Sequence, residues 1–129
     1  MKSESTSILE RFNQSEPADA AYHPDGDYKA FGVSRHAVSL NLIQRDASQV
    51  GISWSLFSDA SFDPAKGIVV EFSHKVVRIE GSRLLQLYQY ILGNRVTFIA
   101  EADRATHKLC IQSEEPVVSK LLVQARRET

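Results

Sequence analysis

The fold is decided by the stretch Gly67-Ile-Val-Val-Glu-Phe-Ser-His-Lys-Val-Val-Arg-Ile-Glu80, which continues through Gly81 and Ser82 toward residue 94. Apolar and polar residues alternate along this stretch, which is the pattern of half-buried β-strands. The alternation changes phase near Ser73-His-Lys75, and a tight turn is the simplest cause of such a change. The pattern therefore predicts an antiparallel hairpin.

Directly after the hairpin, the segment Arg83-Leu-Leu-Gln-Leu-Tyr-Gln-Tyr-Ile-Leu-Gly-Asn94 has apolar residues at helical spacing. It predicts an amphipathic helix over about residues 82–93, with Ser82 as its N-cap. Gly93-Asn94 predicts the end of the helix, because both residue types tolerate the left-handed conformation. The apolar stripe consists of Leu84, Leu87, Tyr88 and Ile91, joined by Leu85 and Leu92. Because this stripe is wide, we expect part of it to be available for contact with another protein surface.

Patterns elsewhere in the chain predict further strands. The predicted strands are 38–43, 50–57, 109–111 and 117–123, while 58–67 reads as a loop because of Pro64 and Gly67. The segment 96–103 fits both a strand and a helix, and the strand is favoured. Trp54 lies on the apolar face of its segment, so we expect it in the core, although aromatic residues there also suit a stacking surface for nucleic acid.

These elements predict an α+β fold, in which one antiparallel meander sheet carries the helix of residues 82–93 on one face. A strongly curved sheet that closes into a small barrel is the alternative. Residues 1–29 are polar and lack a sustained period, so we expect a flexible N-terminal arm there. The domain then spans residues 30–125, and residues 126–129 form a polar tail.

Composition is that of an ordinary soluble domain. The 129 residues are 43% hydrophobic and 24% charged, with 15 basic and 16 acidic residues and a net charge of −1. This balance gives no overall attraction for a polyanion, and no apolar run is long enough to span a bilayer. The single cysteine, Cys110, excludes an intrachain disulfide. Because no signal-peptide pattern is present either, we expect a cytoplasmic location and no membrane association.

Basic residues near the hairpin and helix suggest one possible binding site. His74, Lys75, Arg78, Arg83 and Arg95 lie close together in the sequence and would form a small patch for phosphate or nucleic acid. Acidic residues at Glu71, Glu80, Glu101 and Asp103 lie among them and dilute the positive field. The patch therefore predicts at most a weak nucleic-acid-binding protein.

The segment 101–110 suggests a second, different site. Glu101, Asp103, His107 and Cys110 include residue types that bind divalent metals or act in small enzymes. The spacing supplies few ligands, and no second pair of Cys or His follows. If the segment is helical instead, Asp103 and His107 are simply neighbours on one surface. No glycine-rich phosphate loop or nucleophile motif occurs, so we expect no cofactor.

Packing and turn residues in the second half of the chain have a further pattern: Phe62-Asp-Pro64, Gly67-Ile68, Glu71-Phe-Ser73, Val77-x-Ile-x-Gly81, Leu84, Leu87-Tyr88, Arg95-Val96, Ile99 and Glu101-Ala-Asp103. In these positions, over roughly residues 50–123, the chain resembles a set of small uncharacterised bacterial proteins. The resemblance implies a soluble single domain. It implies no activity and assigns no catalytic residue.

The sequence thus contains enough apolar positions to form a complete core, and it contains no group of polar residues with the pattern of a catalytic site. Such a chain is more typical of a binding protein than of an enzyme. We therefore expect a non-catalytic interaction or self-association module, acting through a sheet edge or through the helix as a homodimer or with a protein partner. Nucleic-acid binding and a metal site or small enzyme in residues 101–110 are the alternatives.

Overall fold

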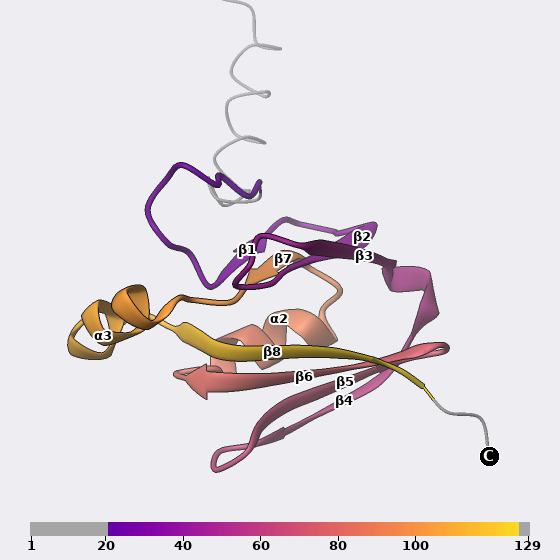
Figure 1. Ribbon diagram of the computed structural model, residues 1–129. Helices are drawn as coiled ribbons and strands as arrows, with labels where there is room; N and C mark the ends of the chain where they lie inside the picture. The colour runs from indigo at the N-terminus through magenta and orange to yellow at the C-terminus, as the bar shows by residue number, and fades with distance from the viewer. Residues whose placement is uncertain (1–20, 127–129) are drawn as a thin grey trace, which may run out of the picture.

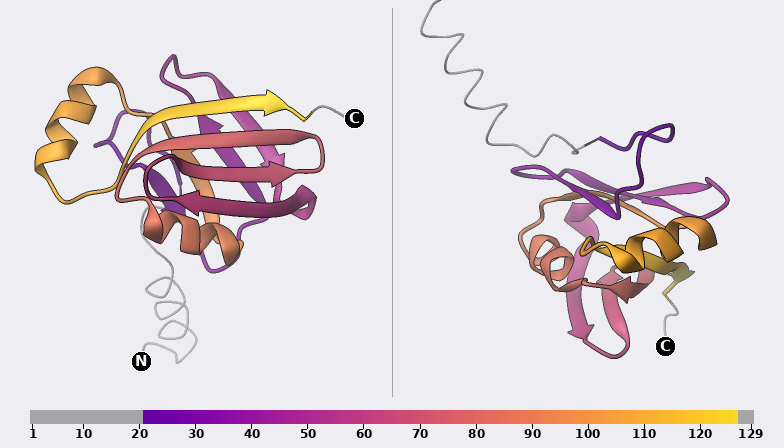
Figure 2. Two further views of the ribbon diagram at one scale, coloured as in Figure 1. Left: turned by 90° about the horizontal axis from the view of Figure 1, so that it is seen from below. Right: turned by 90° about the vertical axis from the view of Figure 1, so that its left-hand side faces the viewer.

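The computed structural model describes residues 21–126 and consists of two four-stranded β-sheets stacked face to face (Figure 1). Helix α2 lies along one side of the stack, between the two sheets, and helix α3 projects from one end (Figure 2). The expectations for residues 1–20 and 127–129, including most of the predicted arm and the predicted tail, lie outside the described residues.

Sheet A has the strand order β1-β7-β2-β3, and sheet B has the order β4-β5-β6-β8. The strands are β1 (Phe31–Val33), β2 (Ser39–Ile43), β3 (Gln49–Ser53), β4 (Phe57–Asp63), β5 (Gly67–Phe72), β6 (Lys75–Ser82), β7 (Val96–Ala100) and β8 (Val117–Ala125). The 3-10 helix η1 (Trp54–Leu56) and the helices α2 (Leu85–Leu92) and α3 (Arg104–Gln112) complete the described elements. Neighbouring strands are antiparallel except β2 and β7, which are parallel.

The predicted hairpin is confirmed as β5 and β6, which pair from Ile68 with Ile79 to Glu71 with Val76. Alternate residues of both strands point into the core, and Val70, Phe72, Val77 and Ile79 are completely buried there. Gly67 begins β5 with a φ of 101°, a conformation that favours glycine. The alternation in the sequence therefore identified the correct face of each strand.

The predicted helix is confirmed as α2, but its start is different. Ser82 is the last residue of β6, the N-cap position is Leu84, and no side chain caps the helix. Arg83 adopts a positive φ of 58° between strand and helix. The strand continues through Ser82 because Ser82 pairs with Val117 of β8, a contact that the local sequence cannot reveal. Asn94, with a φ of 59°, follows the helix in the left-handed conformation, as expected.

Two predictions between residues 50 and 67 are wrong. The strand predicted over 50–57 ends at Ser53, because the Ser53 hydroxyl accepts a hydrogen bond from the Ser55 amide and starts the 3-10 turn η1. This turn carries the chain from sheet A to sheet B. The loop predicted over 58–67 is mostly strand β4, which pairs with β5 at the edge of sheet B. Its polar residues suit the exposed face of an edge strand, and Pro64 follows its last residue.

The segment 96–100 is strand β7, as favoured, whereas the strand predicted at residues 109–111 is part of helix α3. Asp103 explains the helix, because its carboxylate accepts a hydrogen bond from the Thr106 amide and caps the N-terminus. Short β1 was not predicted at all. The β8 prediction is confirmed, with two further residues at the C-terminal end of the strand.

The fold class is therefore mixed α and β, with mostly antiparallel strands, but the predicted single meander sheet is wrong. Over residues 21–126 the strands form two separate sheets and do not close into a barrel. The core between them is filled from both sheets and from α2, through residues such as Leu40, Phe72 and Leu87. Neither α2 nor α3, the helices of the described range, has the length and apolar character needed to cross a membrane.

Candidate functional site

The five basic residues predicted as a patch are spread over distant places. His74 and Lys75 lie at the β5–β6 turn, and Arg78 is exposed on the middle of β6. Arg83 follows the other end of β6, and a strand of eight residues is about 26 Å long. These residues are thus spread along the whole length of one strand and do not form a compact patch.

The Arg95 side chain is engaged in contacts within the fold. Its Nε donates a hydrogen bond of 2.8 Å to the Ser34 carbonyl, and its guanidinium lies 5.0 Å from the centre of the Tyr90 ring. Arg126, which the sequence analysis did not select, is close to the hairpin turn instead, because its amide donates to the His74 carbonyl. Its Nη1 also donates to the Phe72 carbonyl, so this cation too stabilises the fold.

Acidic residues accompany the cations on the solvent face of sheet B. Asp59 of β4 is paired with Glu71 of β5, so two carboxyl groups are neighbours. The hydrogen bond with Asp59, followed by the negative charge of Asp59, raises the pKa of Glu71 above its usual value, while Arg126 and Arg78 oppose this effect. This face therefore has no uniform sign of charge.

Glu71→Gln is expected to stabilise the protein at neutral pH, because it removes repulsion from Asp59. A glutamate with a raised pKa in the folded state binds protons more strongly there than in the unfolded chain. The free energy of unfolding of the wild type therefore falls as pH rises from the usual glutamate pKa through the raised value. The advantage of the variant should disappear in acid below that range.

Urea unfolding at several pH values measures the free energy of unfolding of the variant and the wild type. Glu80→Gln is the control, because Glu80 is paired with Lys120. Equal stability of Glu71→Gln and wild type at pH 7 would contradict the assignment.

The residues of the predicted metal or enzyme site are engaged in structural bonds. The Glu101 carboxylate accepts hydrogen bonds from the amides of Arg45 and Leu121, at 2.7 and 3.1 Å. The Asp103 carboxylate caps α3, and its hydrogen bonds from Thr106 lower its pKa. His107 lies one turn along α3, and the Cys110 side chain lies outside the description. Within the described residues, no three His, Cys, Asp or Glu side chains are grouped as metal ligands.

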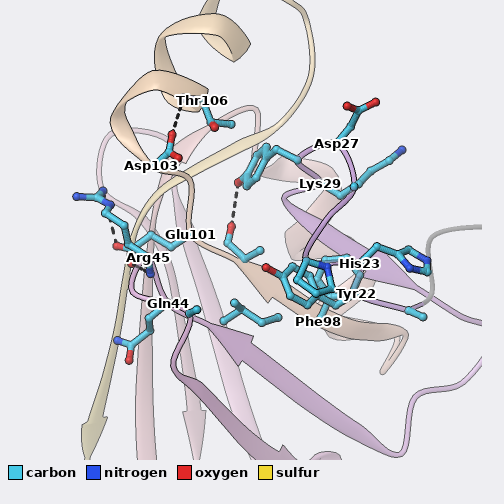
Figure 3. A pocket seen from close by; sticks show the side chains of 17 residues that line it. Tyr22, His23, Asp27, Lys29, Gln44, Arg45, Phe98, Glu101, Asp103 and Thr106 are labelled. Atoms are coloured by element: carbon cyan, nitrogen blue, oxygen red, sulfur yellow. Dashed lines mark hydrogen bonds and ion pairs between the residues drawn. The ribbon is translucent and has the colours of Figure 1, made fainter.

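A pocket of about 560 Å³ lies on the outer side of sheet A, where three segments of the chain meet. Its walls come from residues 21–29, from the β2–β3 turn, and from the stretch between β7 and the start of α3. Tyr22 lies edge-on against Phe98 at the pocket floor. Figure 3 shows His23, Asp27 and Lys29 on one wall, directed away from Arg45 and Glu101 on the other.

The polar groups of this pocket mainly join the two sheets. The Arg45 side chain donates to the carbonyls of Ala102 and Ser119, and its Nη2 lies 3.9 Å from the Glu101 carboxylate. The Tyr28 hydroxyl donates to the Ala100 carbonyl of β7 and accepts from the Val118 amide of β8. These bonds connect sheet A with sheet B. The charged side chains therefore do not converge on one point inside the pocket.

Helix α2 presents a different kind of surface. Leu84, Leu87 and Ile91 are buried in the core, whereas Leu85 and Leu92 on the outer face are 53% and 54% exposed. Exposed Gln89 lies between them at helical spacing, so Leu85, Gln89 and Leu92 form one ridge, called here the α2 ridge. The sequence contained a signal for this ridge, because the apolar stripe was too wide for one buried face.

Apolar surface continues past the C-terminal end of α2. The Ala37 amide donates a hydrogen bond to the Asn94 carbonyl, so the next residue, Val38, lies beside this end of the helix. Val38 is 76% exposed, and its carbonyl accepts from Trp54 at the start of η1. Leu56, two residues after Trp54, is 38% exposed. Val38, far from α2 in the sequence, thus places an exposed apolar residue next to this end of the helix.

Neither a family model, nor a curated protein, nor a solved structure matches this chain. The resemblance to small uncharacterised bacterial proteins accordingly stays a prediction, and no residue role is transferred from a relative.

Proposed function

We propose that the protein is a non-catalytic interaction module that binds a protein surface through the α2 ridge. The observation that carries the proposal is the pair of half-exposed leucines, Leu85 and Leu92, on a helix whose opposite face is already buried. Water-facing helix surfaces usually consist of charged and polar residues. Leu85 and Leu92 do not contribute to the core, so their exposure indicates a contact with another protein surface.

The charge distribution supports this proposal. The eleven residues 84–94 contain no charged side chain, although 24% of the chain is charged. Centres of protein interfaces are poor in charged residues, because burying an unpaired charge is costly. Interfaces are also rich in aromatic residues, and Tyr88, stacked on Phe62, lies next to the ridge. The ridge and its neighbours therefore have the composition of an interface centre.

The placement of the polar residues favours binding over catalysis. Glu101, Arg45 and Tyr28 hold the two sheets together, and Asp103 caps a helix. A general acid or base must reach a substrate proton, and a carboxylate occupied by backbone amides is poorly placed for that. Several of the same bonds join the two sheets on which α2 packs, and a preformed scaffold favours binding because little order has to be gained.

Photo-crosslinking in the protein's own host tests the proposal. A photoreactive benzoylphenylalanine at Gln89 is expected to give a covalent product with a protein, while the same probe at Leu109 of α3 gives little. Leu85→Gln and Leu92→Gln, added together, should abolish the product because they remove the apolar contact. The partner in the product is identified by mass spectrometry, and its binding to the purified protein is then measured. Equal products at Gln89 and Leu109, or none at Gln89, would refute the proposal.

A further inference from the structure

We infer that the partner of the α2 ridge is a second copy of this chain, in a two-fold dimer whose axis passes by Gln89. The inference rests on the proposed function and names its partner. Two-fold dimers use the same patch on both subunits, so the patch must be complementary to itself. The α2 ridge meets this requirement in its order, its chemistry and its charge.

The order of the ridge is nearly symmetric, because Leu85 lies four residues before Gln89 and Leu92 lies three residues after it. Two such helices packed antiparallel, with their Gln89 residues side by side, bring Leu85 of each copy against Leu92 of the other. Each leucine then fills the space beside the other helix, as in ridges-into-grooves packing. One rotation therefore covers every exposed apolar side chain of the ridge.

The residue at the predicted axis suits its position. A residue on a two-fold axis meets its own copy, so a charged side chain there would face a like charge. Gln89 is neutral, and its amide has both a donor and an acceptor, so two copies can pair with each other.

The size of the surface predicts a dimer of moderate strength. The eight residues of α2 form a helix about 12 Å long. One helix of this length covers less area than the roughly 800 Å² per partner of a standard interface. Exposed Val38, which follows Ala37 beside the end of α2, adds apolar area. We therefore expect dissociation in the micromolar range, so measurements should cover protein concentrations from about 1 to 300 µM.

Sedimentation equilibrium of the purified full chain tests the inference. The wild type is expected to shift from the mass of one chain to that of two over this range. The double variant Leu85→Gln/Leu92→Gln should dissociate about a hundredfold more readily, because four leucines lose their cover in each dimer. The matched control is Leu109→Gln/Leu122→Gln, which makes the same change at leucines of α3 and β8 that are 74% and 36% exposed. The control should dimerise like the wild type.

Cysteine crosslinking tests the position of the axis in a Cys110→Ser background, which removes the chain's one cysteine. Gln89→Cys should form a disulfide-linked dimer on mild oxidation, because the thiol introduced at this position meets the same thiol of the other copy. Leu85→Cys alone should form little dimer, whereas an equal mixture of Leu85→Cys and Leu92→Cys should form the crosslinked heterodimer. Circular dichroism confirms that each variant is folded.

The outcomes separate this inference from the proposed function. A wild type that stays monomeric to about 300 µM, or a dimer unaffected by Leu85→Gln/Leu92→Gln, would overturn the inference. If photo-crosslinking at Gln89 then yields a different protein, the interaction module stands and only its partner changes. If Gln89 also yields no product, both fail. A dimer that crosslinks through Gln89→Cys supports both.

Discussion

Gly81→Ala is expected to destabilise the protein by roughly 3 kcal/mol or more, because the new methyl group has no room. A Cβ atom at Gly81 would lie 1.9 Å from the Val117 carbonyl oxygen and 2.9 Å from its carbonyl carbon. These are backbone atoms of β8, the strand paired with β6, and the register of the pair shifts between Glu80 and Gly81. The strands can accept the side chain only by moving apart.

Gly51→Ala provides the matched control for this variant. Gly51 also lies inside a strand, β3, but a Cβ atom there has no neighbour within 4 Å. Alanine at this position should be neutral or should stabilise the protein by about 0.5 kcal/mol, because it restricts the unfolded chain. Urea unfolding followed by circular dichroism measures both variants. If Gly81→Ala costs no more than Gly51→Ala, the close approach of β6 and β8 is wrong.

Trp54→Ala is expected to lower the free energy of unfolding by about 3–5 kcal/mol. Trp54 is buried where the chain passes from sheet A to sheet B, and its ring contacts Phe57 and Phe72 of sheet B. Its indole Nε1 donates a 2.8 Å hydrogen bond to the Val96 carbonyl of β7 in sheet A. The substitution therefore removes contacts to both sheets and leaves a large cavity between them.

Trp54→Phe separates the two contributions. It retains an aromatic ring against Phe57 and Phe72 but loses the hydrogen bond to Val96, so the expected cost is about 1–2 kcal/mol plus a smaller packing loss. Unfolding must be followed by circular dichroism, because Trp54 is the chain's one tryptophan. Similar stabilities of Trp54→Ala and wild type would show that this residue does not join the sheets.

Neither pair of stability variants should affect the α2 ridge directly, because Gly81, Gly51 and Trp54 lie on other elements. Folded protein is nevertheless needed to present Leu85 and Leu92 on one face of α2. Stability and association therefore have to be measured separately for every ridge variant. Since Leu85 and Leu92 are half exposed in one chain, their replacement should reduce dimerisation with little change in the unfolding of the monomer.

Sequence alone determined the elements whose pattern is long and local. The hairpin of β5 and β6 follows from alternation over consecutive residues, and α2 follows from apolar residues at helical spacing. The end of the helix was also predictable, because Asn94 tolerates the left-handed conformation that it adopts. The width of the apolar stripe on α2 even indicated that some leucines would remain outside the core.

The tertiary structure decided which segments meet. The residues of β4 look like a loop, and they form a strand because β5 offers an edge to pair with. The division into two sheets depends on η1 at Trp54 and on the parallel pairing of β2 with β7, which lie far apart in sequence. The length of β6 separated the predicted basic residues, and long-range contacts used Glu101 and Arg45 as bonds between the sheets. Local periodicity records which side of an element is apolar, but only the packing of distant segments determines which apolar residues, such as Leu85 and Leu92, are left exposed to solvent.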